Sequence, residues 1–536
     1  MPQWKSTNPA IRPTGGLVSR HSGAVIYGLA AATSAGFCLV QCENASISRL
    51  AVLGLGSGGV PQWPDEVLHQ AKQYVAWRLQ LLGIFAPSGI DVLIVGTGFA
   101  GLTAALECTR KGHNVRILER NSTPDLAGDM YFMGLSATRF LKHWPEMQKQ
   151  YNDISPHNAW IETFKHDGQQ MLEPQKVADR LHAQGLDPGS APGAFQTRPL
   201  VYKMLLEQVE KCGIEIEFGK RVVDYFESST EGGVELEDGT RLTADIVVAA
   251  DGIGSKSQRL VGGQVRAKSS GRAMWRAVFP VDVLEQNPKV RGFLQAAERR
   301  GSNCADLLCV TGSEAESWSN TIEADEVLRE MNNTPGAPWS SDFQGLVRCT
   351  PPQTIINFAL WWRDQQPTCT SAEGRVVQIG DCAHSFLPSS GNGATQAIED
   401  AVTLASCLQC GGADKVVEAV EVHKRLRFIR NACAQKLGFS NAELLQQTDW
   451  EKVKIDPRKS SPKLPKWIWQ HDCEAYAHQH YRAVVESIEK GVPLEEDVSF
   501  PPNYPEGYKY EAWNIDQVMA DVRAGKEVVL GAGDWS

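Results

Sequence analysis

Residues Val92 to Leu106 have the sequence VLIVGTGFAGLTAAL, which joins an apolar run, a glycine-rich turn and an apolar helical pattern. The turn carries Gly96, Gly98 and Gly101 with the spacing GxGxxG. In a dinucleotide-binding unit the first glycine makes the turn, the second lets the pyrophosphate approach, and the third lets helix and strand pack closely. The phosphates then lie at the positive end of the helix. The stretch therefore predicts a nucleotide site.

A second glycine-rich stretch, Ala51 to Val60, has the sequence AVLGLGSGGV and competes for the same assignment. Pro61 and Pro64 follow it and would interrupt any helix that starts there. No second strand that ends in an acid follows at the required spacing. We therefore interpret this stretch as a glycine-rich linker or a short strand.

The residues after the later turn complete a strand–turn–helix–strand unit. Leu102 to Lys111 has the pattern of a helix that Gly112 closes, and NVRILER then predicts a strand that ends at Glu119 and Arg120. A carboxylate at Glu119 would accept hydrogen bonds from both hydroxyls of an adenosine ribose and would repel a 2′-phosphate. Arg120 would point to the opposite face. The unit predicts that the protein binds FAD or NAD(P). The carboxylate of Glu119 favours FAD.

The stretch VVQIGDCAHSFLPSSGNGATQAIEDAVTLASCL, from Val376 to Leu408, predicts a second part of the site. Asp381 ends its strand and would bind the hydroxyls of a ribityl chain. A helix expected from about Ala394 follows Gly391 and Gly393, and its free N–H groups would stabilise negative charge on the N1–C2=O edge of a reduced flavin. An ordinary strand–loop–helix crossover is the alternative.

A third motif stands between these two. The stretch ADIVVAADGIGSKSQRL predicts a strand that ends in Asp251 and Gly252. With GxGxxG, DG and GD motifs in this order, the chain resembles the class A FAD-dependent monooxygenases, specifically the fungal salicylate hydroxylase-like branch with the para-hydroxybenzoate hydroxylase fold. Two other segments are similar to that family: GDMYFMGLSATRFLKHW from Gly128, and TRPLVYKML with Arg198. The resemblance extends over residues 88 to 450.

The resemblance implies a cofactor and a reaction. NAD(P)H would reduce FAD, O2 would add at flavin C4a, and the hydroperoxide would hydroxylate or epoxidise a small aromatic or polyketide- or terpenoid-like molecule, in fungal secondary metabolism or aromatic breakdown. Arg198 would lie near the flavin pyrophosphate and Arg120 would make a lesser contact near the adenine. Two alternatives remain: a flavin oxidase or dehydrogenase without oxygen transfer, and a catalytically silent FAD-binding protein.

The candidate catalytic residues are Trp275 and Arg276, in the segment GRAMWRAVFP. The family commonly has Tyr-Arg there, so the tryptophan disfavours a simple phenol-binding scheme. The region around them is rich in aromatic residues that could form a flat apolar pocket, although packing in a core is the more common role for each. We expect His384 to hydrogen-bond its loop, because oxygen transfer needs no protein base there.

The predicted fold class is α/β, with a Rossmann-like FAD-binding domain of the glutathione reductase type, an interleaved β-sheet substrate domain and a helical C-terminal part. The predicted segments are an N-terminal extension at 1–87, FAD-binding parts at 88–165, 166–262 and 371–450, a substrate domain at 263–370, and a C-terminal tail at 451–536. Trp513 and Trp535 are expected to anchor the tail.

Composition narrows the classes of partner. The 536 residues carry a formal net charge of -10, which argues against a nucleic acid partner. The 13 scattered cysteines do not form a disulfide framework and favour a reducing, cytoplasmic compartment. Ala24 to Val40 is apolar but short for a membrane span, so a membrane contact and an extension without fixed structure are both open.

No metal site is predicted. His471, Cys473, His478 and His480 are residue types that bind metals, but on a helix only His471 and His478 share a face, and they lie too far apart to chelate alone. Surface or packing roles are the better interpretation. The expected partners are therefore a small-molecule substrate and O2.

Overall fold

The computed structural model describes β1 (Tyr27–Leu29), β2 (Phe37–Gln41), β3 (Leu50–Gly54) and most of residues 87–536. The gaps in the second range are residues 129, 157–159, 184–194, 263–266, 281–282, 285–289, 291–303, 312–319, 334–337, 447–449, 456–462, 498, 500, 525 and 527.

Two compact units divide the chain, Met1–Arg78 and Leu79–Ser536. In the first, β1, β2 and β3 form an antiparallel sheet in that order. Strand β3 covers the start of AVLGLGSGGV, as expected for a short strand, while residues 55–60 of that stretch lie outside the described residues. No helix in the described residues is long and apolar enough to cross a membrane.

A five-stranded parallel sheet organises the second unit. Its strands are β4 (Asp91–Val95), β5 (Asn114–Glu119), β10 (Ile216–Phe218), β14 (Ile246–Ala249) and β19 (Val376–Gln378), in the order β10-β5-β4-β14-β19. In β4, Val92 and Ile94 pack into one core, and Leu93 and Val95 into another. Successive side chains of a strand point to opposite faces, so the apolar run is buried on both sides.

Different layers cover the two faces of this sheet. The Val92 face packs on α2 (Phe99–Arg110), α4 (Pro145–Ile154), α6 (Arg198–Lys211) and α10 (Gly393–Gly411). The Leu93 face packs on an antiparallel sheet of β11 (Val222–Glu227), β12 (Gly232–Leu236) and β13 (Arg241–Ala244), through Tyr225, Val234 and Leu236. This three-layer arrangement confirms the predicted α/β fold class.

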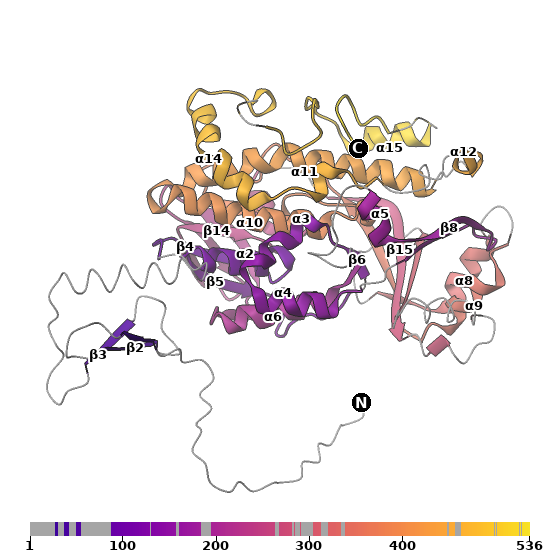
Figure 1. Cartoon of the computed structure of the whole chain (residues 1–536), viewed down its shortest axis with the longest axis horizontal. Coiled ribbons are helices and arrows are strands. Elements are labelled where there is room, and N and C mark those ends of the chain that lie inside the picture. The colour runs from indigo at the N-terminus through magenta and orange to yellow at the C-terminus, as the bar shows by residue number, and fades with distance from the viewer. Residues whose placement is uncertain are drawn as a thin grey trace, which may run out of the picture. The chain divides into compact units, whose positions relative to one another are not determined.

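A second, antiparallel sheet lies in the chain between β14 and β19. Its order is β16 (Cys304–Thr311), β15 (Lys268–Pro280), β18 (Ile355–Trp362) and β17 (Thr321–Ile322). Helices α8 (Ala324–Asn333) and α9 (Ser341–Cys349) lie beside this sheet (Figure 1) and share a hydrophobic core with its residues. Shorter elements are α3 (Leu135–Thr138), β6 (Met130–Phe132), β7 (Trp160–Phe164), β8 (Gln170–Lys176), α5 (Val177–Ala183) and β9 (Phe195–Thr197).

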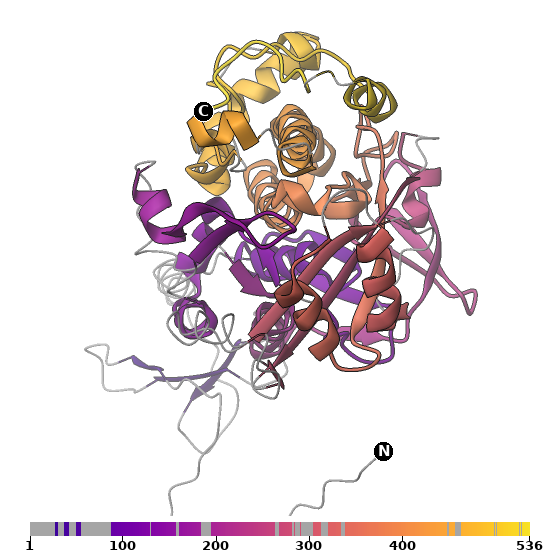
Figure 2. The same ribbon diagram turned by 90° about the vertical axis from the view of Figure 1, so that its right-hand side faces the viewer.

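In the C-terminal third, α11 (Val416–Gln446) and α14 (Cys473–Glu489) pack on α10. The other helices of this part are α12 (Trp450–Ile455), α13 (Lys466–Trp469) and α15 (Ile515–Arg523). Figure 2 looks along α10 and α11, with the last segments of the chain above them. Trp535 packs on Trp467 and Tyr508, and Trp513 packs on Phe439, so both tryptophans anchor the tail as predicted.

We predict that a chain starting at Ser88 folds and binds FAD. All strands of the parallel sheet follow this residue, and Ser88 itself is held by its N–H, which donates to the Gly112 carbonyl at 2.8 Å, and by its hydroxyl, 2.7 Å from His113 Nδ1. Circular dichroism and the flavin absorbance of the purified variant check this. A folded but colourless protein would show that earlier residues belong to the cofactor site.

Candidate cofactor-binding site and active site

The glycine turn between β4 and α2 shows why each glycine is there. Gly96 has φ +101°, and a Cβ on it would stand 2.5 Å from the Ala250 carbonyl oxygen. A Cβ on Gly101 would collide with the Gly96 carbonyl oxygen. A Cβ on Gly98 would meet nothing within 4 Å. Gly96 and Gly101 thus serve the close packing of the turn, and Gly98 borders open space at the helix N-terminus, where a pyrophosphate fits.

Glu119 and Arg120 point to opposite faces at the end of β5, as the alternation of side chains along a strand predicts. Glu119 is buried, whereas Arg120 is exposed. The Oε2 atom of Glu119 accepts hydrogen bonds from the Thr97 N–H at 3.1 Å and its hydroxyl at 2.8 Å, and Oε1 accepts from the Asn121 N–H at 2.8 Å. The carboxylate therefore also holds the glycine turn through Thr97, a residue that motif spacing alone did not single out.

The DG and GD motifs meet because β14 and β19 are parallel neighbours. Asp251 and Gly252 follow β14, while Gly380 and Asp381 begin the 3₁₀ turn η6 (Gly380–Cys382) after β19. The Gly252 N–H donates to Cys382 Sγ at 3.1 Å, and that thiol donates to Asp251 Oδ1 at 3.3 Å. Burial raises the pKa of Asp251. Asp381 is an exposed residue at the strand end, while burial of its carboxyl raises the pKa of that group.

Arg363 connects the loop after β14 with the loop after β19. This residue was not singled out from the sequence. Its buried guanidinium donates to the Cys382 carbonyl at 2.7 Å and to the Ile253 carbonyl at 2.5 Å. Burial lowers its pKa. The sequence signal that could have pointed to Arg363 is its position as a positive charge directly after the apolar stretch TIINFALWW.

The start of α10 offers backbone donors, as predicted. Gly391 has φ +60°, and a Cβ there would lie 3.3 Å from two carbon atoms of Phe132. The helix begins at Gly393, one residue before the expected Ala394. The first hydrogen bond of the helix runs from the Gln396 N–H to the Asn392 carbonyl at 2.8 Å, so the N–H groups of the preceding residues have no helical partner.

Arg198 begins α6 and is half-buried. Its guanidinium donates to the carbonyl oxygens of Asp125 and Ala127, the first at 3.3 Å, and a Cβ on Gly128 would clash with its stem. In this structure Arg198 therefore holds the loop that follows Glu119. Its contact with a pyrophosphate stays a prediction.

Trp275 and Arg276 point to opposite faces of β15. Trp275 is 4% exposed and packs with Ala277 and Phe279 in the core that α8 and α9 share, so packing is its role in this structure. Arg276 is half-buried on the other face, where its Nη2 donates to the Met130 carbonyl of β6 at 3.3 Å. Only Arg276 of the two candidates therefore faces the part of the chain that carries the glycine turn.

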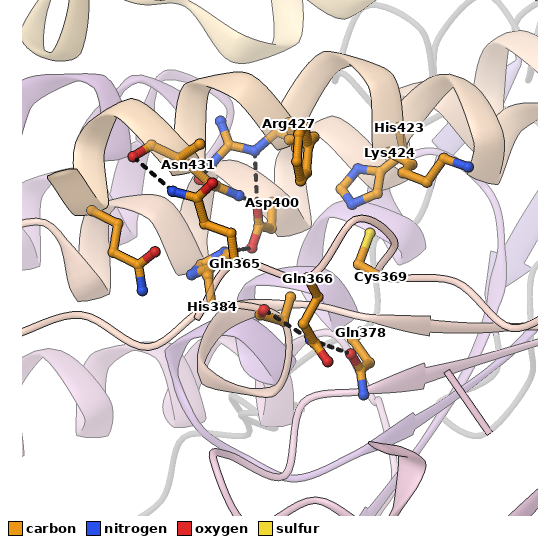
Figure 3. A pocket seen from close by; sticks show the side chains of 14 residues that line it. Gln365, Gln366, Cys369, Gln378, His384, Asp400, His423, Lys424, Arg427 and Asn431 are labelled. Carbon is orange, nitrogen blue, oxygen red and sulfur yellow. Dashed lines mark hydrogen bonds and ion pairs between the residues drawn. The ribbon is translucent and has the colours of Figure 1, made fainter. Parts of the chain in front are cut away.

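A small pocket lined mostly by residues with polar side chains lies beside the GD turn, between the 365–384 segment, α10 and α11 (Figure 3). Its volume of about 40 Å³ suits a few water molecules, not a dinucleotide. Among its lining atoms, Oε1 of Gln366, Oε1 of Gln435 and Nδ1 of His384 and His423 are buried without a hydrogen-bond partner.

The histidines and the cysteine near α14 have surface or packing roles, and Cys473 is buried in the core. His478 contacts Gln409 at 3.1 Å, and the rings of His471 and His480 pack on Tyr476. In the part of the chain that the structure describes, no group of three His, Cys, Asp or Glu side chains could hold a metal ion.

Comparisons with known proteins agree with this geometry. Residues 89–411 match the FAD binding domain family. The FAD-dependent monooxygenase fsr3 of Gibberella fujikuroi is 37% identical over 481 residues, which cover 84% of this chain and 90% of the relative. The crystal structure of CtdE in complex with FAD and substrate 4 is 28% identical, with a TM-score of 0.67, and covers 75% of this chain and 100% of that one.

A salicylate hydroxylase–substrate complex shares the fold, with 23% identity and a TM-score of 0.56 over 73% of this chain and 97% of that one. The chain belongs to the FAD-dependent monooxygenases with this FAD binding domain, of class A, and FAD is its cofactor. The open space at Gly98, the acid at Glu119 and the free helix starts of α2 and α10 fit a long dinucleotide.

We predict opposite effects for two alanine substitutions in the glycine turn. Gly98→Ala should fold normally but bind FAD at least tenfold more weakly, because its methyl enters only the space that the pyrophosphate needs. Gly101→Ala should lower the melting temperature, because its methyl meets the Gly96 carbonyl. Thermal unfolding and FAD titration measure both. Equal stability losses for the two variants would contradict these roles.

We also predict that Glu119→Ala weakens FAD binding by about 1.5–3 kcal/mol, since charged hydrogen bonds to the ribose are lost. Arg120→Ala is the matched control on the exposed face and should leave the dissociation constant nearly unchanged. FAD titration of both variants is the measurement. A large loss for Arg120→Ala alone would show that the adenosine lies on the other side of β5.

Proposed function

We propose that this FAD-dependent monooxygenase uses NAD(P)H and O2 to hydroxylate or epoxidise an electron-rich carbon of a small aromatic or polyketide- or terpenoid-like molecule. The observation that carries the proposal is the hydrogen bond from Arg276 to the Met130 carbonyl, since it places Arg276 beside β6, in the predicted FAD-binding part 88–165. The names of the fungal relatives also support the activity.

The face of the sheet that carries Arg276 is the proposed substrate wall. Directly opposite residues of paired strands share a face, so Met274 stands with Phe358, and Arg276 with Ile356. In the residues described, the wall would thus be apolar and aromatic, with the guanidinium of Arg276. Such a surface suits a flat apolar molecule with an acceptor oxygen, which the arginine would bind and orient. We assign residues 263–370 to the substrate domain on this basis.

The remaining residues would bind and orient the cofactor. Gly98 and the start of α2 would hold the pyrophosphate, with Arg198 nearby, and Glu119 would hold the adenosine ribose. Asp381 and the start of α10 would hold the ribityl chain and the pyrimidine edge of the flavin. When bound, FAD supplies electron transfer from NAD(P)H and activation of O2. The sheet would also keep water from the reacting atoms.

An oxidase that never transfers oxygen is the second candidate, and product analysis separates the two. We would incubate the purified protein with NAD(P)H in air and a panel of phenols, polycyclic aromatic compounds and alkenes. A product heavier by one oxygen atom supports the monooxygenase. NAD(P)H consumption that yields only H2O2 with every compound that binds would support the oxidase.

We place the protein in the cytoplasm because its 13 cysteines are odd in number and scattered.

Within this scheme we predict that Arg276→Ala keeps FAD but loses at least tenfold in kcat/KM for oxygenated product, because one charged hydrogen bond to the substrate disappears. Arg259→Ala is the control, since this exposed arginine only approaches Asp224 at 3.8 Å. Product formation and NAD(P)H consumption are measured together. Unchanged product formation in Arg276→Ala would remove Arg276 from the active site.

A further inference from the structure

Four hydrogen bonds converge on the buried carboxylate of Asp400. Its Oδ2 accepts from the Gly380 N–H at 2.9 Å and lies 2.5 Å from His384 Nε2. Its Oδ1 accepts from Arg427 Nε at 2.7 Å and from Asn431 Nδ2 at 3.3 Å. Asp400 is 1% exposed, so no solvent competes for these bonds.

Asp400 and two of its partners belong to the two halves of the proposed flavin site. Gly380 directly precedes Asp381, and His384 follows it in the same turn. Asp400 itself lies in α10, seven residues after Gly393, or about 10 Å along the helix that starts at the pyrimidine edge. One carboxylate therefore links the acid that would hold the ribityl chain to the helix that would hold the ring.

We propose that Asp400 is a positioning residue for FAD: it sets the distance between the Asp381 turn and the N-terminal N–H groups of α10. The proposal rests on the proposed placement of the flavin between these two elements. Asp400 does not touch the cofactor and acts through Gly380 and His384.

A small cavity borders the turn on the side of α10 and α11. Ala383 and His384 line the cavity, and so does Asp400 (Figure 3). Arg363 and the packing of Cys382 also hold this turn, and the bonds of Asp400 to Gly380 and His384 act on the side that borders the cavity. When the carboxylate is lost, the turn can move into this space.

The charge of Asp400 makes its bonds strong. Burial alone would raise the pKa of this carboxyl, but His384 and Arg427 outweigh burial and hold it well below its usual range. The third neighbour, His423, has its pKa lowered to about 4 by burial. An ionised carboxylate accepts stronger hydrogen bonds than an amide oxygen does.

The chain offers a matched control in the preceding residue, Glu399. This carboxylate is also buried, and it accepts from Arg427 at 2.6 Å, from Arg430 at 2.7 and 2.9 Å, and from Ser136 at 2.7 Å. None of these bonds reaches the Asp381 turn. Glu399→Gln and Asp400→Asn thus remove one buried charge each beside Arg427, and only the second loosens the turn.

The experiment compares the two variants in the full-length protein. We expect Asp400→Asn to weaken FAD binding about tenfold and to lower the midpoint potential of the bound flavin, because the helix start no longer sits against the ring edge that gains charge on reduction. Glu399→Gln should lower the melting temperature about as much as Asp400→Asn does. It should keep the dissociation constant for FAD and the flavin potential of the unsubstituted protein.

Equal effects of the two variants on affinity and potential would overturn the proposal, since they would show a general stability effect. If Asp400→Asn does not fold, His384→Gln tests the same link, because it leaves the Asp400–Arg427 pair intact. Unchanged FAD affinity and potential in His384→Gln would then overturn it. Asp381→Ala tests the underlying placement separately: full FAD occupancy in that variant would show that the flavin lies elsewhere.

Discussion

Parallel pairing of β4, β14 and β19 is the constraint on which the site depends. Parallel strands end at the same edge of a sheet, so the glycine turn, the DG motif and the GD motif become neighbours although they are far apart in the sequence. The contact of the Gly96 turn with Ala250, and those of Gly252 and Asp251 with Cys382, show how closely these ends pack. A long dinucleotide can therefore span loops that three separate segments supply.

The second sheet is inserted in the chain between β14 and β19. The inserted segment leaves β14 after Gly252, at the edge where the cofactor would bind, and it crosses to the opposite edge of the parallel sheet before it enters β19. Alternation along β15 then divides its side chains: Trp275 goes to the core with α8 and α9, and Arg276 to the face that meets β6. The protein thus builds a stable core and a proposed substrate wall from adjacent residues.

The sequence was most informative where the interactions are local. The glycine spacing and the burial of Glu119 with exposure of Arg120 follow from turn sterics and strand alternation, and both agree with the structure. Residues that act over long sequence distances were not predicted. Arg363 joins loops at 253 and 382, and Asp400 joins 380 to α11, so their roles depend on the packing of whole elements. Strand alternation alone also could not say which of Trp275 and Arg276 faces the core.

A crystal structure of the protein with bound FAD tests the central claim most directly. The account predicts the pyrophosphate beside Gly98 at the start of α2, the adenosine ribose at Glu119, and the isoalloxazine between Asp381 and the first N–H groups of α10, facing Arg276 across the substrate space. A flavin ring away from the start of α10, or an adenosine at the GD turn, would contradict it.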